Sequence, residues 1–144
     1  MKICFDMDGT IANLYGVEGW LDCLIAEDVK PYREAKVLLN MNTLARLLNK
    51  AQRKGHEIVS ISWTSKNGSD KYNKAVEEVK RAWLRKHLAS VKFDEIHVVK
   101  YGTNKANFAK SENDILFDDE ENNRKAWTGK AYDVNNILEV LKAI

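Results

Sequence analysis

Two aspartates two residues apart, Asp6 and Asp8, follow the apolar run at residues 3–5 and precede Gly9. Strand alternation sends neighbouring side chains to opposite faces. A glycine turn can bring Asp8 back over the same pocket as Asp6 and expose backbone amides to a bound anion. The spacing therefore favours a carboxylate nucleophile beside a proton donor.

Two other interpretations of this spacing compete with catalysis. A calcium-binding loop also begins with alternating acids, but it requires glycine at its sixth position and glutamate at its twelfth. Counted from Asp6, these positions hold Ile11 and Val17, which excludes such a loop. Two solvated acids in a surface turn are the remaining alternative, because short motifs also arise by chance.

A second group of polar residues ends the β-branched stretch at 58–65, which lies between Gly55 and the turn at 66–68. The composition predicts a buried strand that stops at a hydroxyl-rich turn. Ser62 is the first choice for a hydroxyl that binds an anion. Thr64 is the alternative, because the strand end can be drawn two residues later. A lone serine in this position is also a common helix cap.

A third group is acidic. The apolar run at 115–117 ends in Asp118, Asp119 and Glu120. Adjacent carboxylates repel one another and raise one another's pKa unless a cation lies between them. Magnesium prefers hard oxygen ligands and is commonly held by one or two carboxylates. The run of acids therefore predicts a magnesium site.

The sequence DMDGT at residues 6–10, placed after a strand, resembles the first motif of the haloacid dehalogenase-like (HAD) superfamily of magnesium-dependent phosphatases. In that superfamily, a strand ending in Ser or Thr, a later lysine and a strand ending in two acids follow in this order. The chain contains all of them between Lys2 and about Glu120. Lys105 matches the lysine position, with Lys100 and Lys110 as competitors.

The resemblance implies a mechanism. Asp6 is expected to attack phosphorus and form an aspartyl phosphate, while Asp8 protonates the leaving alcohol and then activates water. Lys105 and the hydroxyl of Ser62 or Thr64 are expected to stabilise the phosphoryl oxygens. An acid at position 8 favours phosphomonoester hydrolysis over dehalogenation or phosphonate cleavage in this superfamily.

The resemblance also implies a magnesium cofactor and a ligand set for it. The expected ligands are the carboxylate of Asp6, the main-chain carbonyl of Asp8, and either Asp118 or Asp119. Which of the two last residues binds the metal directly stays open.

Length and periodicity predict one α/β domain over residues 1–144. We expect a three-layer Rossmann-like core with a parallel sheet flanked by helices, as in the HAD fold, because strands and helices alternate along the chain. Apolar spacing from Val37 to Ala51, with Gly55 as a stop, predicts one helix, and Tyr72 to His87 a second. A short strand at 131–133 and a terminal helix are expected to follow.

Substrate choice in this superfamily depends on a cap inserted after the first or second motif. Only residues 11–30 are available after the first, and their pattern predicts one short amphipathic helix, a minimal cap. The pocket should therefore be open or shared with a neighbouring subunit. The segment loosely resembles the 5'(3')-deoxyribonucleotidase branch, which implies a nucleotide or another small phosphate ester as substrate. Tyr15 and Trp20 can stack on a base or pack against the core.

Charge leaves two alternative functions open. With 23 basic and 21 acidic residues, the net charge of +2 disfavours a nucleic-acid coat protein. A basic cluster is expected to be a solvated helix face, but it leaves a polynucleotide end-phosphatase as an alternative. The cluster consists of Lys66, Lys71, Lys74, Lys80, Arg81, Arg85 and Lys86. A non-catalytic HAD-like binding module is the other alternative.

Cys4 and Cys23 lie far apart, and the sequence has neither a signal peptide nor an apolar run long enough to span a bilayer. These features predict a cytoplasmic protein that is not embedded in a membrane.

Overall fold

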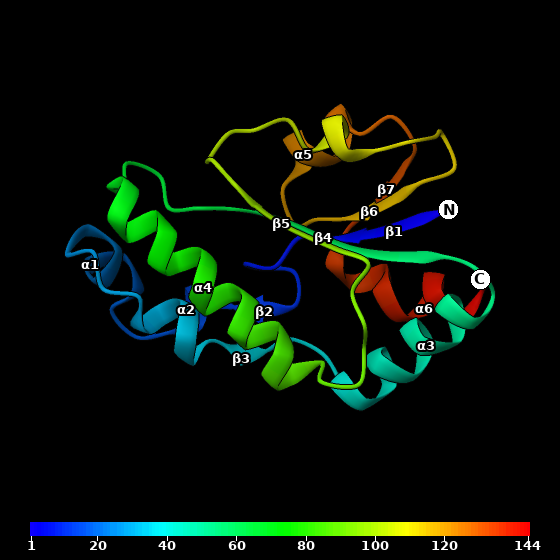
Figure 1. Ribbon diagram of the computed structural model, residues 1–144, viewed down its shortest axis with the longest axis horizontal. Coiled ribbons are helices and arrows are strands. Elements are labelled where there is room, and N and C mark those ends of the chain that lie inside the picture. The colour runs from blue at the N-terminus through cyan, green and yellow to red at the C-terminus, as the bar shows by residue number, and fades with distance from the viewer.

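The fold is built on a five-stranded parallel sheet, and the computed structural model describes all residues 1–144. The strand order is β5-β4-β1-β6-β7, with every neighbouring pair parallel. The strands are β1 (Lys2–Phe5), β4 (Glu57–Trp63), β5 (Glu95–Val99), β6 (Ile115–Phe117) and β7 (Lys130–Tyr132). The predicted α/β fold is confirmed (Figure 1).

Strand alternation divides the core into two layers of side chains. The larger cluster includes Ile3, Ile58 and Phe117 and packs against α3 (Met41–Arg53), α4 (Asp70–His87) and α6 (Ile137–Lys142). The smaller cluster includes Cys4, Leu116 and Trp127 on the opposite face. That face is covered by η2 (Lys105–Phe108) and α5 (Glu121–Ala126), which complete a three-layer, Rossmann-like arrangement (Figure 1).

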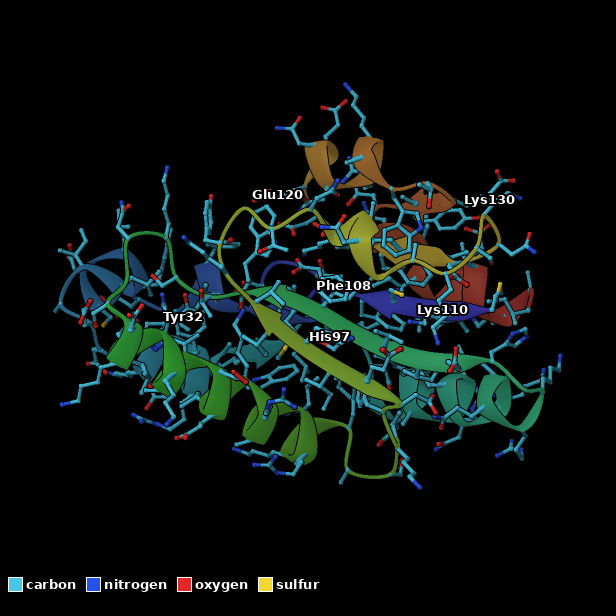
Figure 2. The ribbon with its side chains drawn as sticks, turned by 45° about the horizontal axis from the view of Figure 1, so that its top comes forward. Tyr32, His97, Phe108, Lys110, Glu120 and Lys130 are labelled. Carbon is cyan, nitrogen blue, oxygen red and sulfur yellow. The ribbon has the colours of Figure 1, made fainter.

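The covering of the second face extends to the sheet edge. Phe108, at the end of η2, stacks against His97 of β5 with ring centroids 4.4 Å apart (Figure 2). Because both faces of the sheet are covered, the three central strands β1, β4 and β6 are largely buried, whereas the edge strands β5 and β7 stay partly exposed.

The helix predicted from residue 37 onward begins later, at Met41. Asn40 caps it by accepting a hydrogen bond from the backbone N–H of Thr43 at 3.0 Å. Val37 instead belongs to β3 (Lys36–Val37), which pairs antiparallel with β2 (Ala12–Asn13). The apolar residues at 37 and 38 matched helical spacing by coincidence, so their assignment to the helix was wrong.

The segment between β1 and α3 carries two short helices where one was predicted. It contains β2, η1 (Leu14–Gly16), α1 (Trp20–Ile25), α2 (Lys30–Glu34) and β3, and it extends beyond the expected limit at residue 30. None of the residues of α1 is buried, and Ile25 is 74% exposed. The segment closes on itself because Ala12 pairs with Val37.

The C-terminal part follows the sequence prediction closely, since β7 is succeeded by η3 (Val134–Asn136) and α6. Ile137 and Leu141 of α6 are buried against the larger cluster. None of the helices is both long enough and apolar enough to cross a membrane.

Candidate functional site

The predicted site residues gather at the carboxyl end of the parallel sheet. Asp6 directly follows β1, Thr64 follows β4, and Asp118 follows β6. Because β1 has β4 on one side and β6 on the other, its end is the point where strand order reverses. Ligands bind at such points in open α/β sheets.

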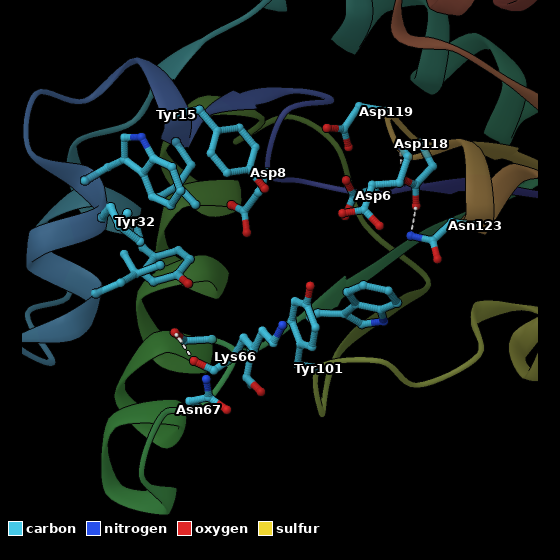
Figure 3. A pocket seen from close by; sticks show the side chains of 18 of the residues that line it. Asp6, Asp8, Tyr15, Tyr32, Lys66, Asn67, Tyr101, Asp118, Asp119 and Asn123 are labelled. Carbon is cyan, nitrogen blue, oxygen red and sulfur yellow. Dashed lines mark hydrogen bonds between the residues drawn. The ribbon is translucent and has the colours of Figure 1, made fainter.

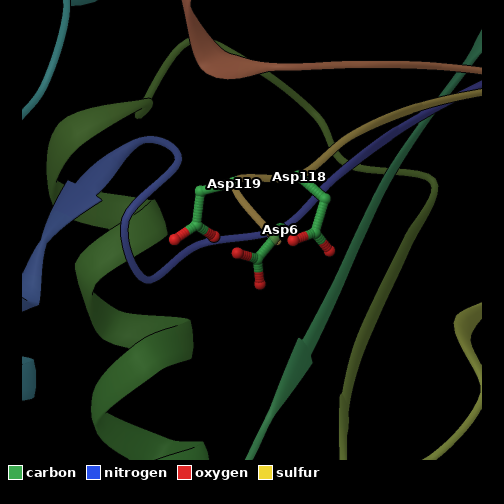
Figure 4. Close-up of side chains that lie close together, drawn as sticks. All are labelled: Asp6, Asp118 and Asp119. Atoms are coloured by element: carbon green, nitrogen blue, oxygen red, sulfur yellow. The ribbon is translucent and has the colours of Figure 1, made fainter. Parts of the chain in front are cut away.

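Three carboxylates converge there. One oxygen from each of Asp6, Asp118 and Asp119 lies within 4.8 Å of the others (Figure 4). Gly9, with a φ of +79°, permits this approach, because a Cβ at that position would collide with the Asp119 carboxylate. The hydroxyl of Thr10 donates to Asp6 Oδ2 at 3.0 Å and accepts from the backbone N–H of Asp119 at 3.2 Å.

Lys105 is the lysine that reaches these acids. Its Nζ lies 2.9 Å from Asp6 Oδ1 and 2.7 Å from Asp118 Oδ2. The ammonium also lies 5.2 Å from the ring centroid of Trp63, whose Nε1 donates to the carbonyl of Thr103 at 2.9 Å. Lys105 lines the cavity beside the acids, and its competitors Lys100 and Lys110 do not.

Burial and neighbouring charges shift the pKa values of Asp6, Asp118 and Asp119 in different directions. Burial alone would raise the pKa of Asp6, but Lys105 reverses the effect and lowers it. Burial and the Asp6 charge raise the pKa of Asp118 to about 6, with Lys105 opposing. The same two causes, joined by Asp118, raise the pKa of Asp119 to about 8. One acid is thus held ionised while its neighbours resist ionisation.

The donor set fits a divalent cation. Three hard carboxylate oxygens converge, and the raised pKa values of Asp118 and Asp119 express a repulsion that a cation between them would relieve. Lys105 supplies one positive charge against three carboxylates. The cluster therefore has an excess of negative charge that Mg²⁺ could neutralise.

The two candidate hydroxyls lie in different places. Ser62 is inside β4, fully buried, and its Oγ has no hydrogen-bond partner. It does not line the cavity, whereas Thr64, one residue past the strand, does so together with Ser65. The location favours Thr64 as the anion-binding hydroxyl.

Lys80 is the residue that sequence reasoning misplaced. It was expected on a solvated helix face, but its side chain is 1% exposed. Its Nζ bonds to Asp8 Oδ2 at 2.8 Å and to the carbonyl of Trp63 at 2.7 Å. The signal was present in the spacing, because position 80 continues the buried stripe of Tyr72 and Val76 at intervals of four.

Asp8 borders the cavity beside Asp6. Burial raises the pKa of its carboxyl, an effect that Lys80 only partly opposes. The pKa of Asp8 is thus shifted upward while that of Asp6 is shifted downward.

A cavity of about 480 Å³ opens in front of the acids. Figure 3 shows Asp6, Asp118 and Asp119 on one side, and Tyr15 and Tyr32 on the other. Its nine apolar or aromatic lining residues are Leu14, Tyr15, Trp20, Leu21, Leu24, Ile25, Tyr32, Trp63 and Tyr101. Tyr15 and Trp20 thus face the cavity, where their rings meet edge to face at 4.9 Å.

No family model matches this sequence, and neither does any curated protein.

Proposed function

We propose that this protein is a magnesium-dependent phosphomonoester hydrolase of the HAD type, with Asp6 as its nucleophile. The observation that supports it most directly is the convergence of Asp6, Asp118 and Asp119 at the carboxyl end of the sheet, where Lys105 pairs with the first two. Their order along the chain is that of the HAD motifs.

Asp6 has the properties of a carboxylate nucleophile. Its two oxygens are held by Lys105 and Thr10, and its lowered pKa keeps it ionised. Attack on phosphorus by one of these oxygens would give an aspartyl phosphate and divide one difficult step into two easier ones.

Asp8 has the properties of the acid and base. Its side chain lines the cavity beside Asp6 and burial raises its pKa, so a protonated Asp8 could deliver a proton to the leaving oxygen. The resulting carboxylate can then accept a proton from the water that hydrolyses the intermediate. A single residue thus acts in both half-reactions.

Asp6, Asp118 and Asp119, with the main-chain carbonyl of Asp8, would hold the metal. Bound Mg²⁺ supplies charge stabilisation for the phosphoryl oxygens and orients the phosphate. Lys105 and Thr64 also line the cavity and would add hydrogen-bond donors for the phosphoryl oxygens.

We further propose that the substrate is a small ester whose alcohol carries a flat, partly apolar group, as a nucleotide does. The aromatic residues of the cavity, Tyr15, Trp20, Tyr32, Trp63 and Tyr101, offer stacking surfaces beside the acids. The end-phosphatase alternative has less support, since Lys66 is the single member of the basic cluster that lines the cavity.

Phosphate release from p-nitrophenyl phosphate and from nucleoside monophosphates tests the proposal. We expect turnover that requires Mg²⁺ and disappears in Asp6→Asn. Lys74→Met, a change on the exposed side of α4, is the control and should retain full activity. A metal-dependent rate that persists in Asp6→Asn would contradict the role of Asp6, and no turnover in the wild type would favour the binding module.

A further inference from the structure

Lys80 is buried, charged and next to the site, yet it does not line the cavity. We propose that Lys80 is a positioning residue, which holds the Asp8 carboxyl in the orientation that proton transfer to the leaving group requires. The inference rests on the proposed function, because it assigns Asp8 as the acid.

The contacts of Lys80 fix one oxygen of Asp8 and leave the other free. Its Nζ binds Asp8 Oδ2 at 2.8 Å, while Oδ1 makes no hydrogen bond within the protein. Asp8 is 19% exposed and lines the cavity, whereas Lys80 is 1% exposed. Oδ1 is therefore the oxygen available to a substrate, and Lys80 binds the other oxygen from outside the cavity.

The same ammonium joins separate parts of the molecule. Besides Asp8, which follows β1, it binds the carbonyl of Trp63 at 2.7 Å, at the end of β4. It also lies 5.2 Å from the ring centroid of Tyr32, a cavity residue of α2. Lys80 thus sets the place of Asp8 relative to the strand end that precedes Thr64 and to the inserted segment.

A purely structural role explains this lysine poorly. Position 80 lies on a buried stripe between Val76 and Leu84, where an apolar side chain would fill the space. Replacing a buried ion pair by apolar residues of similar volume is often neutral or stabilising, because desolvation of both charges is avoided. What the lysine adds at this position is a directed bond to Asp8.

The choice of leaving group distinguishes positioning of an acid from a general structural role. p-Nitrophenolate departs without protonation, whereas the alkoxide of an alkyl phosphate requires a proton. We compare p-nitrophenyl phosphate with the best alkyl substrate among nucleoside 5'-monophosphates and glycerol phosphate. Thermal unfolding of each variant verifies that it is folded.

We expect Lys80→Met to lower kcat/KM, which reports formation of the aspartyl phosphate, by about tenfold or more for the alkyl phosphate. It should leave kcat/KM for p-nitrophenyl phosphate within about threefold. In an Asp8→Asn background, the same change should cause no further loss, because Lys80 acts through Asp8. If Lys80→Met does not fold, Lys80→Arg carries the same expectation with a smaller effect, since it retains a cation. Lys74→Met, on the exposed side of the same helix, should behave as wild type.

Equal losses in kcat/KM on both substrates, or a further loss in the Asp8→Asn background, would overturn the role of Lys80 while the phosphatase stands. A wild-type protein that releases no phosphate from any substrate would instead reject the proposed function, and the positioning role with it.

Discussion

The two ends of β6 each carry a buried aspartate, and the two behave in opposite ways. Asp114 precedes the strand and is 2% exposed, and Asp118 follows it and is fully buried. Burial raises the pKa of both, but the outcome is a lowered pKa at Asp114 and a raised one, about 6, at Asp118. The neighbours of each carboxylate decide the difference.

Asp114 is surrounded by backbone donors. It accepts hydrogen bonds from the N–H groups of Lys2 at 2.7 Å, Lys110 at 2.7 Å and Ser111 at 3.1 Å. Such amides stabilise the ionised form of a carboxylate. Asp114 thus ties the beginning of β1 to the turn that precedes β6.

Asp118 is surrounded by charges as well as donors. Lys105 lies 2.7 Å away, but Asp6 and Asp119 add negative charge to the same space. The comparison teaches that burial of an acid does not mark a site. Crowding with like charge does, because it leaves an electrostatic cost that a ligand can remove.

The largest effect on activity is expected from a change at Asp118, at the end of β6 where three carboxylates lie close together. Asp118→Asn should lower kcat by about 10³-fold, since it removes a proposed metal ligand and a partner of Lys105. Steady-state phosphate release with varied Mg²⁺ measures this. If the variant keeps more than a tenth of the wild-type rate, Asp118 is not part of the site.

At the other end of β6, a change at Asp114 should lower stability and not activity. Asp114→Asn replaces a charged acceptor of three amides, and we expect the free energy of unfolding to fall by about 3 kcal/mol. Activity per folded molecule should stay unchanged. Chemical denaturation and phosphate release on the same samples check both, and a selective loss of activity would remove the contrast between the two ends.

A smaller loss of stability is expected from a change at Gly129, in the bend before β7. Gly129 lies so close to the carbonyl of Asp114 that a Cβ would collide with the backbone. Gly129→Ala should destabilise the protein by about 2 kcal/mol through overpacking and leave kcat unchanged. Denaturant titration gives the value. A variant as stable as wild type would mean that the backbone around Gly129 and Asp114 can shift at little cost in free energy.

A further effect concerns pH in the metal-free protein. The pKa of Asp119 rises from 3.8 to about 8 on folding, so the folded state holds a proton that the unfolded state releases. The stability from this group is present below pH 3.8 and is lost as pH rises toward about 8. Melting temperatures in chelator should therefore favour Asp119→Asn over wild type increasingly as pH rises, and then level off.

Asp22→Asn, which removes an exposed acid, should show no such pH trend relative to wild type. Saturating Mg²⁺ should reverse the trend, since metal binding requires ionised ligands. A pH-independent difference between wild type and Asp119→Asn in chelator would contradict the crowding of the acids.

Much of the fold was predictable because its signals are local. The strand at β1 followed by DMDGT, the apolar run before Asp118 and the stripe of α4 each lie within a few residues. Parallel pairing then brings their ends together without further information. The choice between Ser62 and Thr64 required the strand end itself, which the sequence defines only to within a few residues.

Lys80 was missed for a different reason. Its charge placed it with six other basic residues, and its burial depends on two acceptors from distant segments, the Asp8 carboxylate and the Trp63 carbonyl. No residue within α4 indicates that these acceptors lie beside Lys80. The apolar residues at 37 and 38 failed similarly, because their pairing partner β2 lies more than twenty residues earlier.

The closure of the inserted segment by β2 and β3 has a consequence for protein engineering. Ala12 pairs with Val37, so the two ends of the inserted segment lie side by side. The positions of these ends therefore do not depend on the length of the segment between them. Lengthening such a loop adds an entropic penalty that grows only logarithmically. The exposed turn at Glu18 and Gly19 is accordingly a point where larger specificity modules can be grafted while the strand ends, and the acids on them, stay in register.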